Sequence, residues 1–201
     1  MQTNSLNLMV NSKNVPKRKK KKSVVQTKAV KKQAAKKPVA ETITYRPRTA
    51  QDDAFIVSLT QSELGEIHQQ SFGQPFPAEQ FRRYIESGAP TVVIERNGKP
   101  VGYYSYLVSP DGKMHVSAMV IDPKHQNAGI GKKAVAKLEE DARKMGVHTM
   151  EVFVQESNAQ SLAFARSLGF REVFRVEPNT IGFHKYLVTP QTGPIAQPSF
   201  F

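Results

Sequence analysis

Residues 120–140 read VIDPKHQNAGIGKKAVAKLEE, and within them the chain changes from strand-like to helix-like spacing. The first of these residues end an apolar, β-rich run, and Asp122-Pro123 marks a turn. The apolar residues that follow have helical spacing, and they are Ile130, Ala134, Val135 and Leu138. We expect the helix to run to about Met145, where Gly146 ends it. A strand that leads through a short turn into an amphipathic helix indicates a mixed α/β domain.

The turn, QNAGIG at residues 126–131, has the composition of an anion-binding loop. Gly129 and Gly131 carry no side chain, so the backbone can approach a diphosphate while N–H groups at the helix start face it. Lys132 and Lys133 add positive charge. The loop lacks the Gly-Lys-Ser/Thr of a Walker motif and the third glycine of a dinucleotide-binding fingerprint. Turn geometry alone would also explain two glycines, so both interpretations stay open at this point.

The chain before this stretch predicts a strand, two helices and an antiparallel meander. We expect a strand over 42–48 and then a helix, a loop over 69–76, and a second helix from Pro77 to Gly88. Residues 91–108 read TVVIERNGKPVGYYSYLV, two β-rich runs joined by Asn-Gly, which favours a type I′ hairpin. A further turn leads into a third strand that ends at Ile121.

The second half of the chain alternates between strand and helix. We expect a strand over 149–154, a helix over 158–168, and strands over 171–176 and 181–188. The order is β α α β β β α β α β β, so the predicted sheet is antiparallel in its first half and contains a β-α-β crossover in its second. The predicted organisation is a tail over 1–40, one domain over 41–188 and a proline-containing tail over 189–201.

Charge is concentrated at the amino terminus. The chain has 201 residues and a formal net charge of +12, and residues 1–40 contain no acidic residue. Such a segment cannot bury enough apolar surface to fold alone, so we expect a disordered basic tail whose lysines bind phosphates through residues 13–37. A purely solubilising role is the alternative. The expected nucleic-acid contacts are Lys17, Arg18, Lys19, Lys20, Lys21, Lys22, Lys31, Lys32, Lys36 and Lys37.

Composition excludes several classes of site. The chain has no cysteine, which rules out disulfides, thiolate metal ligands and cysteine nucleophiles, and its five histidines show no metal-ligand spacing. No run approaches the roughly 20 apolar residues of a membrane span, so we expect no membrane partner. We expect a cytoplasmic location, or a nuclear or nucleoid-associated one if the tail acts as a targeting or DNA-binding segment.

Residues 42–188 resemble the GNAT superfamily of N-acetyltransferases. The resemblance is carried by four motifs, which are RPRTAQDD at 46–53, NGKPVGYY at 97–104, Gln-x-x-Gly-x-Gly at 126–131 and SNAQSLAFARSLGF at 157–170. It implies the acyl-CoA N-acyltransferase fold, acetyl-CoA as cofactor and an amine as acceptor.

The resemblance also implies where acetyl-CoA would bind. The loop amides would hold the pyrophosphate, the strand at 119–121 would pair with the pantetheine arm, and a backbone N–H near Val120 would stabilise the oxyanion. The implied cofactor residues are Met119, Val120, Ile121, Gln126, Asn127, Ala128, Gly129, Ile130, Gly131, Lys132 and Asn158. Asn158 is equally suited to be a helix N-cap, and both roles can hold together. Phe164 and Phe170 are expected in the core.

The catalytic groups depart from the family pattern. Many members carry a tyrosine as general acid seven residues after the asparagine, and this chain has Ala165. Ser117 stands where many relatives have glutamate, and serine is no base, although it can hold a water. The sequence therefore does not identify the catalytic residues. The candidate groups within reach of the site are His115, Tyr104, Tyr106, Glu151 and Ser117, and further alternatives are Tyr103 and His184.

We therefore expect an N-acetyltransferase that moves the acetyl group of acetyl-CoA to a protein or polyamine amine, localised by its tail to nucleic acid or a nucleoprotein. Ala165 and Ser117 favour one alternative, a nucleic-acid-binding protein on a GNAT scaffold with weak or no catalysis. A second alternative is an enzyme that acetylates a small molecule such as an antibiotic or a polyamine. Monomer and dimer are equally compatible with the sequence.

Overall fold

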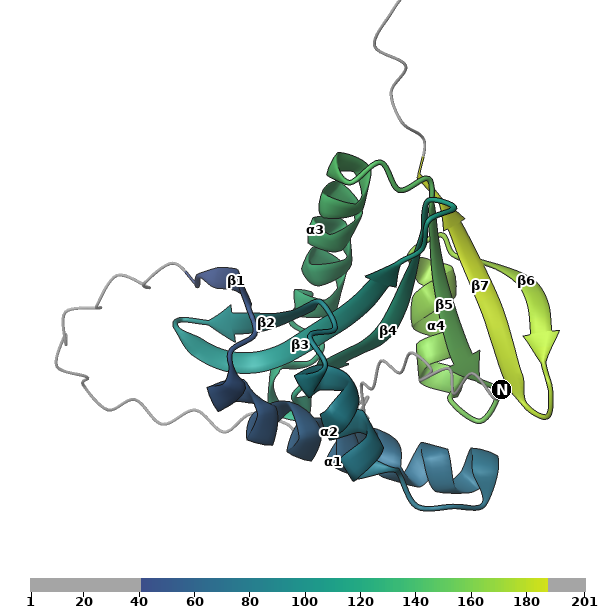
Figure 1. Cartoon of the computed structure of the whole chain (residues 1–201), viewed down its shortest axis with the longest axis horizontal. Helices are drawn as coiled ribbons and strands as arrows, with labels where there is room; N and C mark the ends of the chain where they lie inside the picture. Colours follow the sequence, from purple (N-terminus) through teal and green to yellow (C-terminus); the bar gives the residue numbers. More distant parts are fainter. Residues whose placement is uncertain (1–40, 188–201) are drawn as a thin grey trace, which may run out of the picture.

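A computed structural model of the chain describes residues 41–187, which fold as one mixed sheet between two layers of helices (Figure 1). The seven strands lie in the order β1-β2-β3-β4-β5-β7-β6, antiparallel except for the parallel pair β4–β5. The strand bounds are Ile43–Pro47 (β1), Thr91–Arg96 (β2), Lys99–Val108 (β3), Lys113–Ile121 (β4), Thr149–Gln155 (β5), Arg171–Val176 (β6) and Thr180–Tyr186 (β7).

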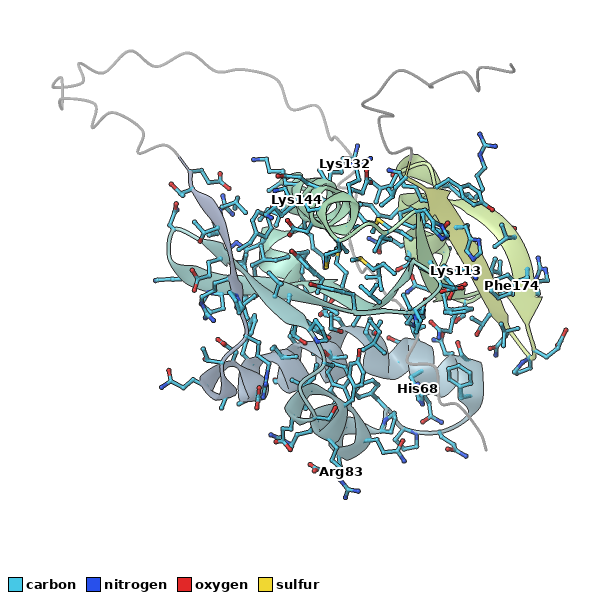
Figure 2. All side chains as sticks on the ribbon, turned by 45° about the horizontal axis from the view of Figure 1, so that its top comes forward. His68, Arg83, Lys113, Lys132, Lys144 and Phe174 are labelled. Carbon is cyan, nitrogen blue, oxygen red and sulfur yellow. The ribbon has the colours of Figure 1, made fainter. Side chains whose placement is uncertain are left out.

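Helices α1 and α2 cover one face of the sheet, and α3 and α4 cover the other, as Figure 2 shows with the sheet between the two layers. Two short 3-10 turns, η1 and η2, precede α1 and α3. The bounds are Ala50–Asp52 (η1), Asp53–Phe72 (α1), Ala78–Glu86 (α2), Pro123–His125 (η2), Ile130–Lys144 (α3) and Ala159–Ser167 (α4).

The predicted element order and mixed sheet are confirmed. The Asn97-Gly98 hairpin is also confirmed, because both residues have positive φ angles, 53° and 75°. One prediction is wrong: residues 69–72, expected in a loop, form the last turn of α1. The helix ends only at Gly73, whose φ of 68° closes it, and the ring of Phe72 packs on His68 with centroids 4.8 Å apart. These contacts extend the helix past the point where the apolar period fades.

The core is divided by the sheet into two clusters, and β4 contributes to both. Met119 and Ile121 pack with α3 and α4, whereas Ala118 and Val120 pack with α1 and α2. This alternation follows from the two-residue period of a strand. Because β4 is buried on both faces, its backbone edge toward β5 is the part that remains for other contacts.

An opening at that edge positions the site. β4 and β5 pair only through residues 113–115 and 149–151, and beyond these residues the two strands are not paired. A bulge in the β3–β4 ladder accommodates Ser117 as an extra residue opposite Ser105 and Tyr106. The unpaired second half of β4 runs directly into η2 and α3. The sheet therefore opens between β4 and β5, next to the start of α3.

The tail predicted over 1–40, with its expected nucleic-acid contacts, lies outside the described residues, as does the segment from 188 onward. The predicted domain limits stay predictions. Over residues 41–187, none of the helices combines the length and the apolar character that crossing a bilayer requires.

Candidate active site

The loop before α3 is held in a shape that leaves the start of that helix uncapped. Asp122 Oδ1 accepts a hydrogen bond from the Lys124 N–H at 2.9 Å, and Gln126 Nε2 donates to the Ile121 carbonyl at 2.7 Å. Asn127 and Gly129 have left-handed backbones, with φ of 61° and 75°. Gly129 is the N-cap residue and offers no side-chain hydrogen bond to α3. Among the described residues, the first N–H groups of the helix therefore lack an intrahelical partner and a side-chain cap.

Electrostatics at this helix start favour an anion. The first turn of α3 contains no acidic residue, and Lys132 lies in that turn, as Figure 2 shows. A cation at a helix N-terminus is opposed by the helix dipole, which amounts to about +0.5 charge there. Positive charge therefore accumulates at the start of α3, from Lys132, Lys133 and the free N–H groups, and a bound phosphate would neutralise it.

The two loop glycines have different structural reasons. A Cβ on Gly129 would meet nothing within 4 Å, so its positive φ is what requires glycine. A Cβ on Gly131 would lie 3.1 Å from the Phe164 ring, so this glycine lets α4 approach α3. That both glycines let the backbone approach a diphosphate stays a prediction.

Several buried polar side-chain atoms near the opening have no partner within the described residues. They include Oε1 of Gln126, after the end of β4, Nδ2 of Asn158, at the start of α4, and both amide atoms of Gln155, at the end of β5. Asn158 also caps α4, since its Oδ1 accepts a hydrogen bond from the Ser161 N–H at 3.0 Å. A buried polar group without a partner costs about 1–3 kcal/mol. Unpaired donors and acceptors beside an unpaired strand edge fit a ligand that carries amide groups, such as a pantetheine arm.

Three of the residues proposed from the sequence as catalytic candidates or alternatives come together on the face of the sheet that α1 covers. Glu151 of β5 lies between two imidazoles, with Oε2 2.8 Å from His184 Nε2 and Oε1 3.5 Å from His115 Nδ1. His115 belongs to the last β4–β5 pair before the opening. All three side chains are partly exposed, between 15% and 23%. A carboxylate at the mouth of the opening can accept a proton, and the imidazoles can orient it.

Aromatic rings adjoin this cluster. Phe153 packs on His115 with centroids 5.1 Å apart, and Phe174 of β6 packs on Phe153 at 5.6 Å and on His184 at 5.8 Å. Phe174 reaches across β7 because Gly182 leaves room: a Cβ there would lie 2.6 Å from the ring. Phe174 remains 41% exposed and stands at the sheet's outer end, as Figure 2 shows.

Ser117 is buried and accepts a hydrogen bond from the Tyr84 hydroxyl at 2.7 Å. Tyr84 belongs to α2, so this hydrogen bond joins α2 to the bulge in β4, two residues after His115. The sequence placed Tyr84 only within the predicted helix from Pro77 to Gly88. Its missed signal was that its hydroxyl needs a polar partner when the ring is packed inward.

The hairpin tyrosines do not join these groups. Tyr103 is fully buried under α1, where its hydroxyl hydrogen-bonds Thr60 and burial raises its pKa. Tyr104 and Tyr106 lie on the opposite face of the sheet with the α3 cluster, and burial raises both of their pKa values. Ala165 is buried on α4. Within residues 41–187, no group of three or more His, Asp or Glu side chains is arranged to hold a metal ion.

Sequence comparison identifies related proteins. Residues 61–170 match the Acetyltransferase (GNAT) family. The L-methionine sulfoximine/L-methionine sulfone acetyltransferase of Salmonella typhimurium is 32% identical over 104 residues, which are 50% of this chain and 61% of that protein. The [ribosomal protein bS18]-alanine N-acetyltransferase of Escherichia coli is 30% identical over 97 residues, 48% of this chain and 62% of that one. The chain thus spans about six tenths of the length of these two relatives.

Comparison with solved structures agrees on the fold. The yncA protein of Salmonella typhimurium, solved with its cofactor acetyl-CoA, superposes with a TM-score of 0.56 at 23% identity, covering 77% of this chain and 99% of that one. The family match spans more than half of the chain and includes the loop, the opening and α4. This chain therefore belongs to the GNAT family of acetyltransferases.

Proposed function

We propose that this protein is an N-acetyltransferase that transfers the acetyl group of acetyl-CoA to an amine. The observation that carries the proposal is the combination of an uncapped, lysine-bearing helix start with an adjacent opening in the sheet. Family membership supports the same reaction class. The Glu151 cluster at the mouth of the opening supplies a proton acceptor.

The residues of the loop and the opening fit acetyl-CoA. The N–H groups at the start of α3 and Lys132 would hold the pyrophosphate, and the free edge of β4 would hold the arm in the manner of an added strand. The unpaired donor of Asn158 would bind an amide carbonyl. Acetyl-CoA supplies the acetyl group in activated form, as a thioester.

The groups on the α1 face would manage the proton. The acceptor nitrogen forms a new amide bond as the C–S bond breaks, and its proton passes to Glu151, directly or through a water. His115 and His184 orient the carboxylate. Ala165 has no proton to donate, so the departing thiolate takes one from water. A backbone N–H near Val120 would stabilise the oxyanion.

The proposed acceptor is an amine on a protein bound to nucleic acid. The basic segment over 13–37 would tether the enzyme electrostatically to nucleic acid or a nucleoprotein, which raises the local concentration of its acceptor. Similarity to an enzyme named for a ribosomal protein's alanine supports this acceptor class. The proposed location follows the tether: the cytoplasm, or the nucleus or nucleoid.

A second candidate acceptor is a small amino acid derivative, and the similarity to a methionine sulfoximine acetyltransferase favours it. One assay separates the two. The purified full chain is incubated with acetyl-CoA and, separately, with methionine sulfoximine, a polyamine, and peptides that carry an amino-terminal alanine or an internal lysine. Mass spectrometry of each product identifies the acceptor. Binding of acetyl-CoA without transfer to any amine would support the catalytically silent scaffold instead.

A further inference from the structure

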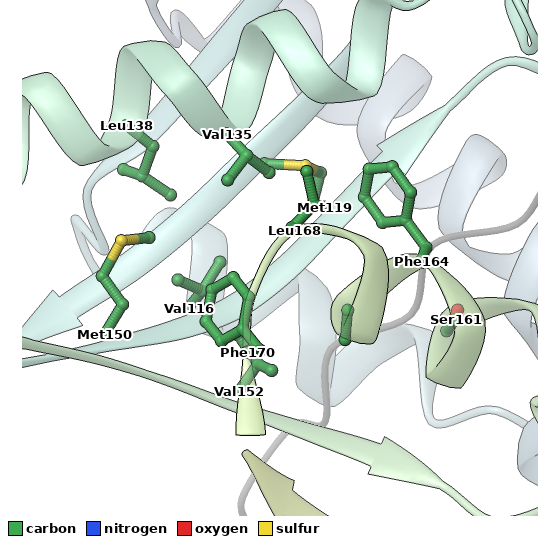
Figure 3. A pocket seen from close by; sticks show the side chains of 11 residues that line it. Val116, Met119, Val135, Leu138, Met150, Val152, Ser161, Phe164, Leu168 and Phe170 are labelled. Atoms are coloured by element: carbon green, nitrogen blue, oxygen red, sulfur yellow. The ribbon is translucent and has the colours of Figure 1, made fainter. Parts of the chain in front are cut away.

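An apolar cavity of about 20 Å³ lies behind the opening, between the sheet and helices α3 and α4 (Figure 3). Its walls come from both strands that part there and from both helices. In Figure 3, Val116 and Met119 of β4, Val152 of β5, and Val135 and Leu138 of α3 converge on the space. Among the described residues that line it, only Ser161 has a polar side chain.

The small side chain of Ala165 helps to leave this space. Ala165 is 4% exposed and lines the cavity from α4, where a longer side chain would extend into it. Protein interiors are packed with few voids larger than a water molecule. A void at this point therefore requires an explanation, and its place beside the opening suggests a ligand group.

The size and the chemistry of the cavity select what can fill it. A water-sized group needs about 10–15 Å³, and a buried water also needs two to four polar partners. The lining offers almost none. The cavity suits one or two hydrocarbon groups better than water, because an apolar chain has no hydrogen bonds to lose.

We propose that this cavity is an acyl pocket, which receives the carbons of an acyl-CoA chain one or two carbons longer than acetyl. The inference rests on the proposed function, since the thioester must lie in the opening for its chain to enter. Met119 connects the opening with the cavity, because its backbone belongs to the unpaired part of β4 and its side chain lines the cavity. Propionyl-CoA and butyryl-CoA are thus expected to bind more tightly than acetyl-CoA.

Calorimetric titration of the full chain with CoA, acetyl-CoA, propionyl-CoA, butyryl-CoA and hexanoyl-CoA tests this pocket. Each carbon that enters the cavity should improve Kd about fourfold, the factor for burying one methylene. The improvement should stop at butyryl, because the cavity is too small for a longer chain. Equal Kd values for all the esters would overturn the acyl pocket and leave the proposed function intact.

Two variants test whether the acyl chain of the ligand lies in the cavity. Ala165→Leu fills the cavity, so the fourfold steps should disappear. Ala163→Leu makes the same change on the exposed side of the same helix and should keep the steps. If Ala165→Leu shows no cooperative thermal unfolding, Val116→Ile narrows the cavity from β4 and should also weaken the preference. If a folded cavity-filling variant still shows the fourfold improvement in Kd per carbon, the acyl chain binds elsewhere and the inference is overturned. Failure of every ester to bind folded wild-type protein would instead overturn the proposed function, and the pocket with it.

Discussion

Replacing Glu151 with glutamine tests the proposed proton acceptor. Glutamine keeps the shape of the side chain and can keep a hydrogen bond to His184, which lies 2.8 Å from the carboxylate. It removes the ability to take a proton. Because the side chain is partly exposed and touches two imidazoles rather than the packed core, we expect little change in the free energy of unfolding.

The expected kinetic loss is that of a general base. Positioned acid–base groups contribute about 10²–10⁴-fold, so kcat should fall at least about a hundredfold, which corresponds to about 2.7 kcal/mol of lost transition-state stabilisation. The Michaelis constant for acetyl-CoA should change little, because Glu151 lies on the α1 face of the sheet, away from the loop before α3.

The assay is CoA release at saturating acetyl-CoA, with the acceptor that the product screen identifies. Glu172→Gln is the matched control, since Glu172 is an exposed carboxylate of β6 paired with Arg166. A folded Glu151→Gln protein whose kcat stays within about threefold of wild type would refute the assignment of the base.

Three further changes probe the loop, the cap and the first strand. Gly131→Ala places a Cβ 3.1 Å from the tip of the Phe164 ring, and this crowding opposes the gain of about 1 kcal/mol that alanine gives a helix, so Tm should change by less than a few degrees in calorimetry. Asn158→Asp keeps the oxygen that caps α4 but removes the unpaired donor, so acetyl-CoA affinity should drop, whereas Asn158→Ala should also remove the cap and cost about 1 kcal/mol of stability. The hydrogen bond from Arg46 lowers the pKa of Asp52, so its carboxylate stabilises the fold above its unfolded pKa of about 3.9, and this stability is lost as pH falls below that value. Urea titrations from pH 6 to pH 2 should show that decline in the wild type and a flatter profile in Asp52→Asn; equal slopes would contradict it.

Local sequence signals predicted most of the fold because they coincide with the packing. The Asn97-Gly98 turn, the switch in period at Ile130 and the glycine after α3 each specify one conformation. The end of α1 was mispredicted because residues 69–72 are held by contacts from outside the helix as well as by the packing of Phe72 on His68. Asn179 donates to the Ser71 carbonyl from 108 residues away, and no local pattern reports such a contact.

The site was predictable only where a single segment builds it. The loop before α3 is continuous in sequence, so its composition alone made an anion site one of two open interpretations. The Glu151 cluster instead requires the register that sets His184 opposite Glu151, and the parallel pairing of Glu151 with His115. The sequence could name these residues as candidates but could not bring them together, because three strands separated by whole helices supply them.

The role of Ala165 was also hidden from the sequence. Family resemblance indicated only that Ala165 stands where many members carry a tyrosine, whereas the structure shows the space beside the small side chain. A cavity depends on how β4, β5, α3 and α4 pack against one another. The cavity therefore results from tertiary packing, and no local sequence pattern predicts it.

The most direct test of this account is calorimetric titration of the full chain with acetyl-CoA, beside Gly129→Glu. The substitution places bulk and negative charge where the pyrophosphate is expected. Gly73→Glu is the matched control, because Gly73 also has a positive φ and open space where a Cβ would lie, but is at the end of α1. We expect saturable binding by wild type and by the control, and at least about a tenfold loss in Gly129→Glu. Absence of binding by folded wild-type protein, or equal affinity in all three proteins, would contradict it.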